Sequence, residues 1–373
     1  MKLAGIRVLD LSQFLPGPHL TMTMADHGAD VIMVEPKNGI GEPVRAMGTR
    51  AADGTSVWFR NIARGKRSIV LDLKNKSDLE TFLRLADEAD VVVEAFRPGV
   101  AARLGIGYDA IAARNPRIVY CSLSAFGQNG PLRDKPSHDL GVQALAGTLE
   151  LSRGFADGKP NMPNLVAADM ASSLTALSAI LMALLARERT DKGEYIDIAM
   201  YDSLLAWTPN IVGSVLGEDR APVPHEMRNY GGQAMNRIYE TGDGGFIVLA
   251  GNEAKFCENL LQALGRLDFL EVAKGEPGET QRPLTEYFVA RFKTKTLAEW
   301  ETFLAPLDLC WAPVRNLNDA FTDDNAAARS MLLHDESGNP HIGSAIKFRR
   351  DPAEPRLELP AYEPGTHITW RNK

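Results

Sequence analysis

The stretch Asp90-Val-Val-Val-Glu94 is the clearest indication of the fold. Its continuous apolar run is typical of a strand that is covered on both faces of a parallel sheet. Similar runs recur through the first 125 residues, at 6–11, 31–34, 69–73, 91–96 and 118–123. Helical segments such as 77–88 separate these runs. Strands that alternate with helices predict βαβ units, and therefore an α/β fold with a Rossmann-like, mostly parallel sheet.

The pattern changes in the second half of the chain. Helices are still expected at 140–151, 169–187 and 202–216, with a strand at 195–199. After these, two short runs at 237–241 and 246–250 flank the sequence Gly-Asp-Gly-Gly, which predicts a β-hairpin. Helices are then expected at about 253–264 and 297–304, separated by a polar loop at 275–283. This α+β pattern predicts a second, smaller domain that begins near residue 220.

The composition is that of an ordinary globular protein. Of the 373 residues, 45% are hydrophobic and 24% are charged, which excludes a disordered or fibrous chain. The net charge of −7 argues against nucleic-acid and anionic-membrane partners, because both require a broad basic face. A small anionic ligand is still compatible with this charge where basic residues are concentrated locally.

Three features bear on cellular location. The cysteines Cys121, Cys257 and Cys310 lie far apart, so neither a disulfide framework nor a zinc site is expected. The first 14 residues mix apolar and charged side chains, unlike a signal peptide. The longest apolar stretch, 170–186, contains several hydroxyl side chains, and we expect a buried helix rather than a membrane span. These features predict a soluble, cytoplasmic protein.

Basic residues are concentrated just before the strand at 69–73: Arg60, Arg64, Lys66 and Arg67. Arg45 and Arg97 add cations at other loop–strand junctions. Ligands of a doubly wound sheet bind at loops beyond strand ends, and Arg and Lys are suited to phosphate groups. The cluster therefore indicates phosphate binding, with a solvated, charged loop as the alternative.

Three positions carry candidate catalytic groups. His138, followed by Asp139, opens a helical segment, and an imidazole exchanges protons near neutral pH. Asp169 lies at the start of a long apolar helix, where a carboxylate acts either as a helix cap or as a positioned base or nucleophile. Glu253 opens another helix and has the same two alternatives. No segment has metal-ligand spacing or a dinucleotide fingerprint, so no metal and no permanently bound cofactor are expected.

Five separated motifs, in order, resemble those of the family III CoA-transferases. The family includes formyl-CoA transferase, carnitine CoA-transferase and α-methylacyl-CoA racemase. The most specific motif is Arg64-Gly-Lys-Arg-Ser-Ile-Val-Leu-Asp-Leu-Lys74. The others are the opening 3–12 with Pro16-Gly17-Pro18, then 96–99, 123–128 and 189–200. The resemblance covers nearly the whole chain.

The resemblance implies a fold that the sequence pattern alone does not. Members of this family form interlocked homodimers of two ring-shaped chains. Each chain would have a large Rossmann-like domain, built from residues 1–220 and a return segment 321–373, and a small α+β domain at 221–320. The substrate would be an acyl-CoA thioester. Its nucleotide would lie beside four basic residues: Arg64, Lys66, Arg67 and Arg97.

Asp169 matches the family's catalytic aspartate. In the transferases this carboxylate attacks the thioester to form an anhydride and then an aspartyl-CoA thioester. In the racemase it exchanges the α-proton opposite a histidine. His138 and Glu253 match a histidine and a glutamate of the racemase, so we favour racemase-like epimerisation with these three residues as catalytic groups. Backbone N–H groups beside Asp169, at the start of its helix, would stabilise the oxyanion.

Transfer of CoA between an acyl-CoA and a carboxylate is the alternative. The sequence Asp-Met-Ala-Ser-Ser at 169–173 lacks the glycines of the racemase and occurs in many transferase-like members. The glycine loop of the transferases is represented only by Gly231-Gly232-Gln233. A non-catalytic CoA-binding subunit is a third hypothesis, but a pure binder would not need the Asp169 carboxylate. The acyl group is open to steroid, branched-chain and short dicarboxylic structures.

Overall fold

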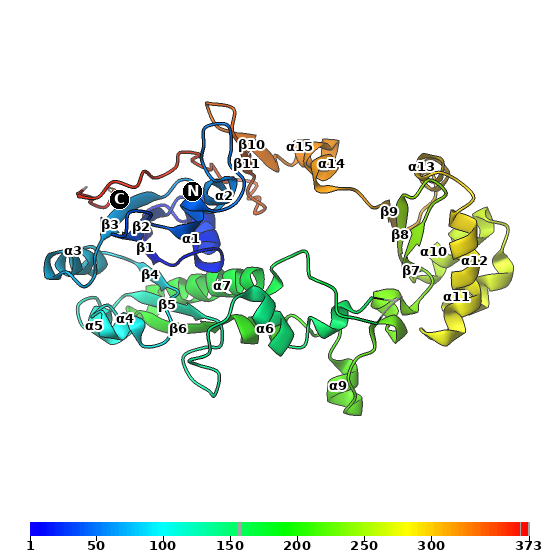
Figure 1. The fold of residues 1–373 in the computed structure, drawn as a ribbon, viewed down its shortest axis with the longest axis horizontal. Helices are drawn as coiled ribbons and strands as arrows, with labels where there is room; N and C mark the ends of the chain where they lie inside the picture. The colour runs from blue at the N-terminus through cyan, green and yellow to red at the C-terminus, as the bar shows by residue number, and fades with distance from the viewer. Residues whose placement is uncertain (155–157, 366, 372–373) are drawn as a thin grey trace. The chain divides into compact units, whose positions relative to one another are not determined.

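The computed structural model describes residues 1–154, 158–365 and 367–371. The chain forms two compact units (Figure 1). Unit 1 comprises residues 1–147, 163–208 and 321–373, and unit 2 comprises residues 148–162 and 209–320. The predicted division at 220 differs from this in two ways: unit 2 begins at Pro209, and it also includes 148–162. Both ends of the chain belong to unit 1.

Unit 1 is built on a six-stranded, fully parallel sheet with the strand order β3-β2-β1-β4-β5-β6. This is the doubly wound order of a Rossmann-like fold, and it confirms the predicted fold class. All four residues of β4 are buried, as expected for a strand that is covered on both faces. The strands are β1 (Arg7–Leu11), β2 (Asp30–Pro36), β3 (Arg67–Leu71), β4 (Val91–Glu94), β5 (Val119–Ser124) and β6 (Glu194–Ala199).

Helices cover both faces of this sheet because successive strand residues point to opposite faces. Val91 and Val93 pack in one core with the helices α1 (Pro16–Asp26) and α7 (Ala167–Thr190). Val92 packs in another core with α3 (Lys76–Asp87) and α5 (Tyr108–Ala112). The remaining helices of this part are α2 (Val57–Ala63), α4 (Val100–Arg103), α6 (Asp139–Leu145) and α8 (Met200–Ala206).

Two helices are shorter than predicted, and each ends at a residue that explains it. The helix expected at 140–151 stops at Leu145, and Gly147 follows with φ 78°, a conformation that glycine adopts readily. The helix expected at 202–216 is divided into α8 and α9 (Gly213–Glu218), with Pro209 between them. Proline disfavours helical geometry in the residue before it.

The longest helix, α7, corresponds to the apolar stretch expected to be buried. By length and composition alone it resembles a membrane span, as core helices of soluble proteins also do. One side of it packs in the core of unit 1 through residues such as Leu177, Ile180 and Leu184. The other side exposes Met182 and Leu185. The prediction of a buried helix is therefore correct for one face only.

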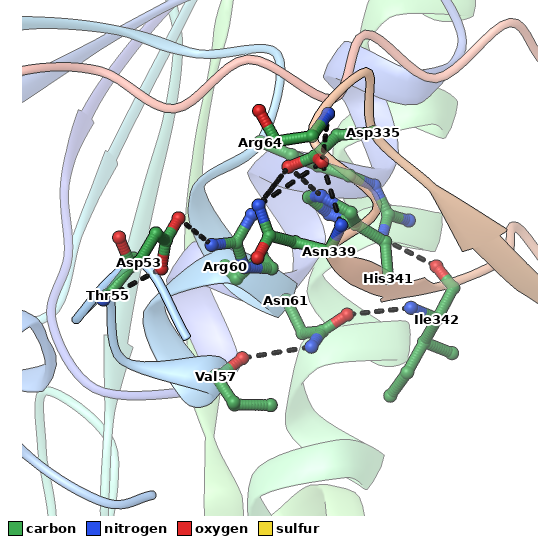
Figure 2. A network of polar contacts seen from close by, with 11 residues as sticks. Asp53, Thr55, Val57, Arg60, Asn61, Arg64, Asp335, Asn339, His341 and Ile342 are labelled. Atoms are coloured by element: carbon green, nitrogen blue, oxygen red, sulfur yellow. Dashed lines mark hydrogen bonds and ion pairs between the residues drawn. The ribbon is translucent and has the colours of Figure 1, made fainter. Parts of the chain in front are cut away.

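Ion pairs and hydrogen bonds around Arg60 of α2 connect the return segment, residues 321–373, to the rest of unit 1 (Figure 2). The almost fully buried Arg60 guanidinium forms ion pairs with Asp53 at 2.5 Å and with Asp335 at 2.8 Å. Asp335 connects β10 (Leu332–His334) and β11 (Pro340–Ile342), and the Ile342 carbonyl accepts a hydrogen bond from Arg64. Further along, the Trp370 side chain enters the core that contains Val92.

Unit 2 has its own sheet and core. The predicted hairpin is present as β7 (Asn236–Glu240) and β8 (Phe246–Ala250), and β9 (Trp311–Pro313) completes an antiparallel sheet. Aromatic side chains dominate the core, among them the fully buried Phe288, Phe292 and Trp300. Its helices, besides α9, are α10 (Ala254–Ala263), α11 (Leu270–Lys274), α12 (Arg282–Phe292) and α13 (Leu297–Leu304). Two short helices, α14 (Leu317–Thr322) and α15 (Asp324–Ala328), lead back into unit 1.

Candidate active site

A pocket of about 380 Å³ opens at the carboxyl-terminal ends of the strands of unit 1. Its walls come from the residues that follow β1, β4 and β6, from the end of β5, and from the loop at 133–138. β1 and β4 are neighbours at the point where the strand order reverses. Open α/β sheets bind their ligands at such a switch point. The candidate residues His138, Asp169 and Arg97 all line this pocket.

Asp169 lies in the first turn of α7 with its side chain half-buried. Burial, together with the negative charge of Asp139, raises the pKa of the Asp169 carboxyl to about 7. No cation contributes to this shift. The carboxylate is therefore poorly stabilised in its ionised form, and such a group is a reactive nucleophile or base at neutral pH.

Asp139 holds the start of α7 in place. The residue preceding this helix, Val166, offers no side-chain cap. Instead, the buried Asp139 accepts hydrogen bonds from the backbone N–H groups of Ala168 at 2.8 Å and Asp169 at 3.2 Å. Its other carboxylate oxygen accepts a hydrogen bond from Gln143 at 2.6 Å. The helix that Asp139 caps begins 28 residues later in the sequence than Asp139 itself.

The cap by Asp139 shows that the expectation of an oxyanion site at the start of α7 is wrong. The backbone N–H groups of Ala168 and Asp169 donate to Asp139. Those of Ala167 and Met170 donate to the carbonyls of Leu165 and Val166. The first turn of α7 therefore has no backbone donor left for an oxyanion beside Asp169.

His138 shares the pocket with Asp169. Its ring is exposed and meets the Phe14 ring edge to face, with 5.7 Å between the ring centroids. Glu253 lies in unit 2, exposed, immediately before α10. Gly231-Gly232-Gln233 also belongs to unit 2. A catalytic role for Glu253 stays a prediction.

The basic residues just before β3 pair with aspartates. Arg64 pairs with Asp26 at 2.7 Å, Lys66 with Asp10 at 2.9 Å, and Arg67 with Asp30 at 2.5 Å. The Arg64 and Lys66 side chains are buried, so they offer no surface to a phosphate. Arg67, the first residue of β3, is partly exposed. The burial and pairing of Arg64 and Lys66 therefore argue against phosphate contacts by these two side chains, and a role for Arg67 stays a prediction.

Three other cations line the pocket: Arg97, Arg133 and Lys135. All three are exposed, and within the part of the chain that the structure describes none of their side chains has an ion pair or a hydrogen bond. Arg97 was expected at a ligand site. Arg133 and Lys135 were missed, although the polar loop Pro131-Leu-Arg-Asp-Lys-Pro136 directly precedes His138. The pocket thus combines unpaired cations with an unpaired acid.

A parallel sheet with a desolvated carboxylate in a cation-lined pocket describes an enzyme that acts on an anionic substrate. Residues 3–367 match the family model described as CoA-transferase family III, and the chain belongs to this family.

Named relatives agree with this assignment. The chain is 38% identical to an acetyl-CoA:oxalate CoA-transferase of Acetobacter aceti, over 95% of this chain and 92% of the relative. It is 33% identical to a succinyl-CoA:mesaconate CoA-transferase of Haloarcula hispanica, over 96% and 93%. Among solved structures, a CAIB/BAIF family protein from Brucella suis has a TM-score of 0.81 with 29% identity, covering 96% of both chains. Rv3272 from M. tuberculosis has a TM-score of 0.82 with 29% identity, again covering 96% of both.

The names of these relatives favour CoA transfer over epimerisation. The expectation that this chain is an enzyme of family III is confirmed. However, the relatives are named as CoA-transferases and not as racemases. CoA transfer, the alternative reading of the sequence, therefore fits better than the epimerisation that His138 and Glu253 favoured.

Proposed function

We propose that this protein transfers CoA from an acyl-CoA donor to a free carboxylate, with Asp169 as the nucleophile. The observation that carries the proposal is the Asp169 carboxylate, which is half-buried in the pocket and forms no ion pair with the described residues. A carboxylate in this state gains most by forming a covalent bond, because the bond removes its poorly solvated charge.

The reaction divides into two symmetrical halves. A carboxylate oxygen of Asp169 attacks the thioester carbonyl and displaces the CoA thiolate, which leaves an acyl–aspartyl anhydride. The thiolate then attacks the aspartyl carbonyl, releases the donor acid and forms an aspartyl-CoA thioester. The acceptor carboxylate displaces the thiolate to form a second anhydride. Attack of the thiolate on the new acyl carbon forms the product and restores Asp169, and no step consumes a proton.

The other residues of the pocket would position the reactants. Arg97, Arg133 and Lys135 would bind the phosphate groups of CoA, because each offers an exposed cation that forms no ion pair among the described residues. Asp139 would fix the direction of Asp169 by holding the first turn of α7. The exposed His138 ring would contact the acyl group beside the nucleophile. Holding the reactants in this way removes much of the entropic barrier to attack.

The acceptor is a short dicarboxylate in this proposal. The names of the two relatives pair acetyl-CoA with oxalate and succinyl-CoA with mesaconate, and that of a third, from Mus musculus, pairs succinyl-CoA with glutarate. The enzyme would act as a homodimer in the cytoplasm. The exposed apolar side of α7, with Leu181, Met182 and Leu185, supports an interface between two copies, because a contiguous apolar face is costly to leave in water.

The test supplies acetyl-CoA or succinyl-CoA together with oxalate, mesaconate or glutarate, and follows new acyl-CoA masses. A separate sample receives a chiral 2-methylacyl-CoA in D₂O without any acceptor. We expect new CoA esters only when an acceptor is present, and no α-deuterium in the second sample. Deuterium uptake with loss of chirality would instead establish the racemase.

The role of Asp169 has its own controls. Asp169→Asn should abolish transfer, and a peptide containing Asp169 should carry the CoA adduct in the wild-type protein with donor alone. Asp134→Asn is the matched control, because Asp134 is an exposed acid of the same pocket. Turnover retained by Asp169→Asn would place the nucleophile elsewhere.

A further inference from the structure

Phe14 lines the pocket in a backbone conformation that an aromatic residue rarely adopts. Its φ is 66°, in the left-handed region that favours glycine. The other non-glycine residues with positive φ, among those described, are two aspartates and a serine: Asp191, Asp219 and Ser330. Such a conformation is strained and persists only where surrounding contacts impose it. The strain lies in the loop between β1 and α1, at the mouth of the proposed active site.

The contact that imposes it comes from Glu42. The Glu42 Oε1 atom accepts a hydrogen bond from the Phe14 backbone N–H at 2.9 Å and another from the Val44 N–H at 3.3 Å. Glu42 is buried, so water does not compete for this carboxylate. Glu42 is not among the residues that line the pocket. Glu42 therefore acts on the pocket through the residues that it holds, and of these Phe14 lines the pocket.

Glu42 is itself held in a rigid frame. Its backbone N–H donates to the Glu35 carboxylate of β2 at 2.7 Å. Arg45 donates to the two oxygens of Glu35 at 2.8 and 2.6 Å, and Ser68 of β3 donates to it at 2.5 Å. The position of Phe14 is thus connected, through the Glu42 and Glu35 carboxylates, to strands β2 and β3.

The ring of Phe14 contacts another residue of the pocket, His138. It packs edge to face against His138, with an interplanar angle of 80°. The next residue, Asp139, caps the turn of α7 that carries Asp169. The Phe14 ring therefore lines the same pocket as Asp169 and contacts the residue that precedes the cap of α7.

We propose that Glu42 is a positioning residue, which holds the strained Phe14 against His138 and thereby shapes the acyl site of the proposed CoA transfer. This inference rests on the proposed function. In its favour, nothing else in the described structure satisfies the Phe14 N–H, and an unsatisfied amide would relax the loop toward an ordinary conformation.

The test compares two substitutions at one site. Glu42→Gln keeps an oxygen acceptor for the Phe14 N–H, whereas Glu42→Met keeps the length of the side chain and removes the acceptor. We expect Glu42→Met to lower kcat about tenfold to hundredfold, because small displacements at the reacting end are costly. The KM for the CoA ester should stay unchanged, since the cations at Arg97 and Arg133 are untouched. Glu42→Gln should restore most of kcat.

Three further measurements keep the result decisive. Thermal unfolding shows whether Glu42→Met is folded. Hydrogen exchange of the peptide that contains Phe14 reports the hydrogen bond without any turnover, and its rate should rise in Glu42→Met but not in Glu42→Gln. In a Phe14→Gly background, which removes both ring and strain, Glu42→Met should have no further effect on kcat.

The outcomes separate the two proposals. If the wild-type protein transfers CoA but kcat of folded Glu42→Met is unchanged, the inference about Glu42 is wrong and the proposed function stands. Unchanged exchange at Phe14 in Glu42→Met also overturns it. If the wild-type protein transfers no CoA, the proposed function fails, and a role for Glu42 in that reaction fails with it.

Discussion

Two groups of basic residues in unit 1 have opposite surroundings. Arg64, Lys66 and Arg67 each pair with an aspartate from another part of the fold, and two of the three are buried. The pocket cations Arg97, Arg133 and Lys135 are exposed at the carboxyl-terminal ends of the strands and have no such partner within the described residues. The first group stabilises the structure, and the second is available to a ligand.

The difference shows what makes a cation a ligand-binding residue. A buried ammonium or guanidinium has lost its hydration and needs a carboxylate to replace it, so its charge is already neutralised. An exposed cation keeps its hydration at no cost, and its field reaches an approaching anion. The acids differ in the same way: Asp10 and Asp26 are paired with cations, whereas Asp169 is not.

The largest expected effect is on stability, from Lys66→Met. This change leaves the Asp10 carboxylate buried without its cation, and losing one partner of a buried pair costs about 3–5 kcal/mol. Urea unfolding should report that loss, while the KM for the CoA ester should not change. Lys192→Met, at an exposed position, is the control. A raised KM for the CoA ester with an unchanged free energy of unfolding would indicate that Lys66 binds the ligand.

A smaller effect, on binding instead of stability, is expected from Arg97→Ala combined with Arg133→Ala. Ion pairs made by exposed side chains contribute up to about 1 kcal/mol each, so the loss of two should raise the KM for the acyl-CoA by up to roughly thirtyfold. The free energy of unfolding should change by less than about 0.5 kcal/mol, as for other surface positions. Arg189→Ala, an exposed arginine near the end of α7, serves as control. An unchanged KM for the acyl-CoA would indicate that the nucleotide of CoA does not bind in this pocket.

The raised pKa of Asp169 predicts that kcat/KM depends on pH, and the expected change is similar to or smaller than the change in KM above. The pKa of Asp169 is raised to about 7, so the nucleophilic carboxylate is present above that pH and is lost as the pH falls below it. At about pH 6, kcat/KM should therefore be roughly one tenth of its plateau value. Asp139→Asn keeps an oxygen to cap α7 but removes the neighbouring negative charge, and should move the profile to lower pH. A profile unmoved by this change would contradict the assignment of the titrating group to Asp169.

The smallest effect concerns salt. Raising the ionic strength from about 0.05 M to about 0.5 M should raise the KM for the acyl-CoA several-fold, because the exposed cations are screened. The double variant lacking Arg97 and Arg133 should show a flatter response. Thermal stability should respond little, since buried pairs are shielded from salt. A wild-type KM independent of salt would mean that the pocket cations do not contact the phosphates.

Sequence patterns predicted the parts of this molecule that depend on local order. The run at 91–94 indicated a strand buried on both faces, and β4 is such a strand. The sequence Gly-Asp-Gly-Gly indicated the hairpin of β7 and β8. Asp169 was recognised because its position at a helix start and its family motif coincide. In each case the determining residues are neighbours in the sequence.

The errors have a common physical origin. The basic stretch before β3 looks like a phosphate site because its partners lie elsewhere in the sequence: Asp26 is 38 residues from Arg64, and Asp10 is 56 from Lys66. Likewise, the cap that Asp139 provides to α7 is visible only once the two helices are packed. A charge is easy to find in a sequence, but whether it is already neutralised depends on contacts that only the fold creates.

The ion pair between Arg60 and the return segment has a consequence for the folding of this chain during its synthesis. Arg60 and its second carboxylate, Asp335, are separated by 275 residues. At about 5–20 residues per second, a ribosome needs roughly 14 to 55 s to synthesise that interval. Throughout this time the nascent N-terminal part holds an arginine that has only one of its two carboxylate partners, Asp53, while all of unit 2 emerges. The usual order, in which the N-terminal domain is finished first, is therefore reversed: unit 1 begins first and is completed last.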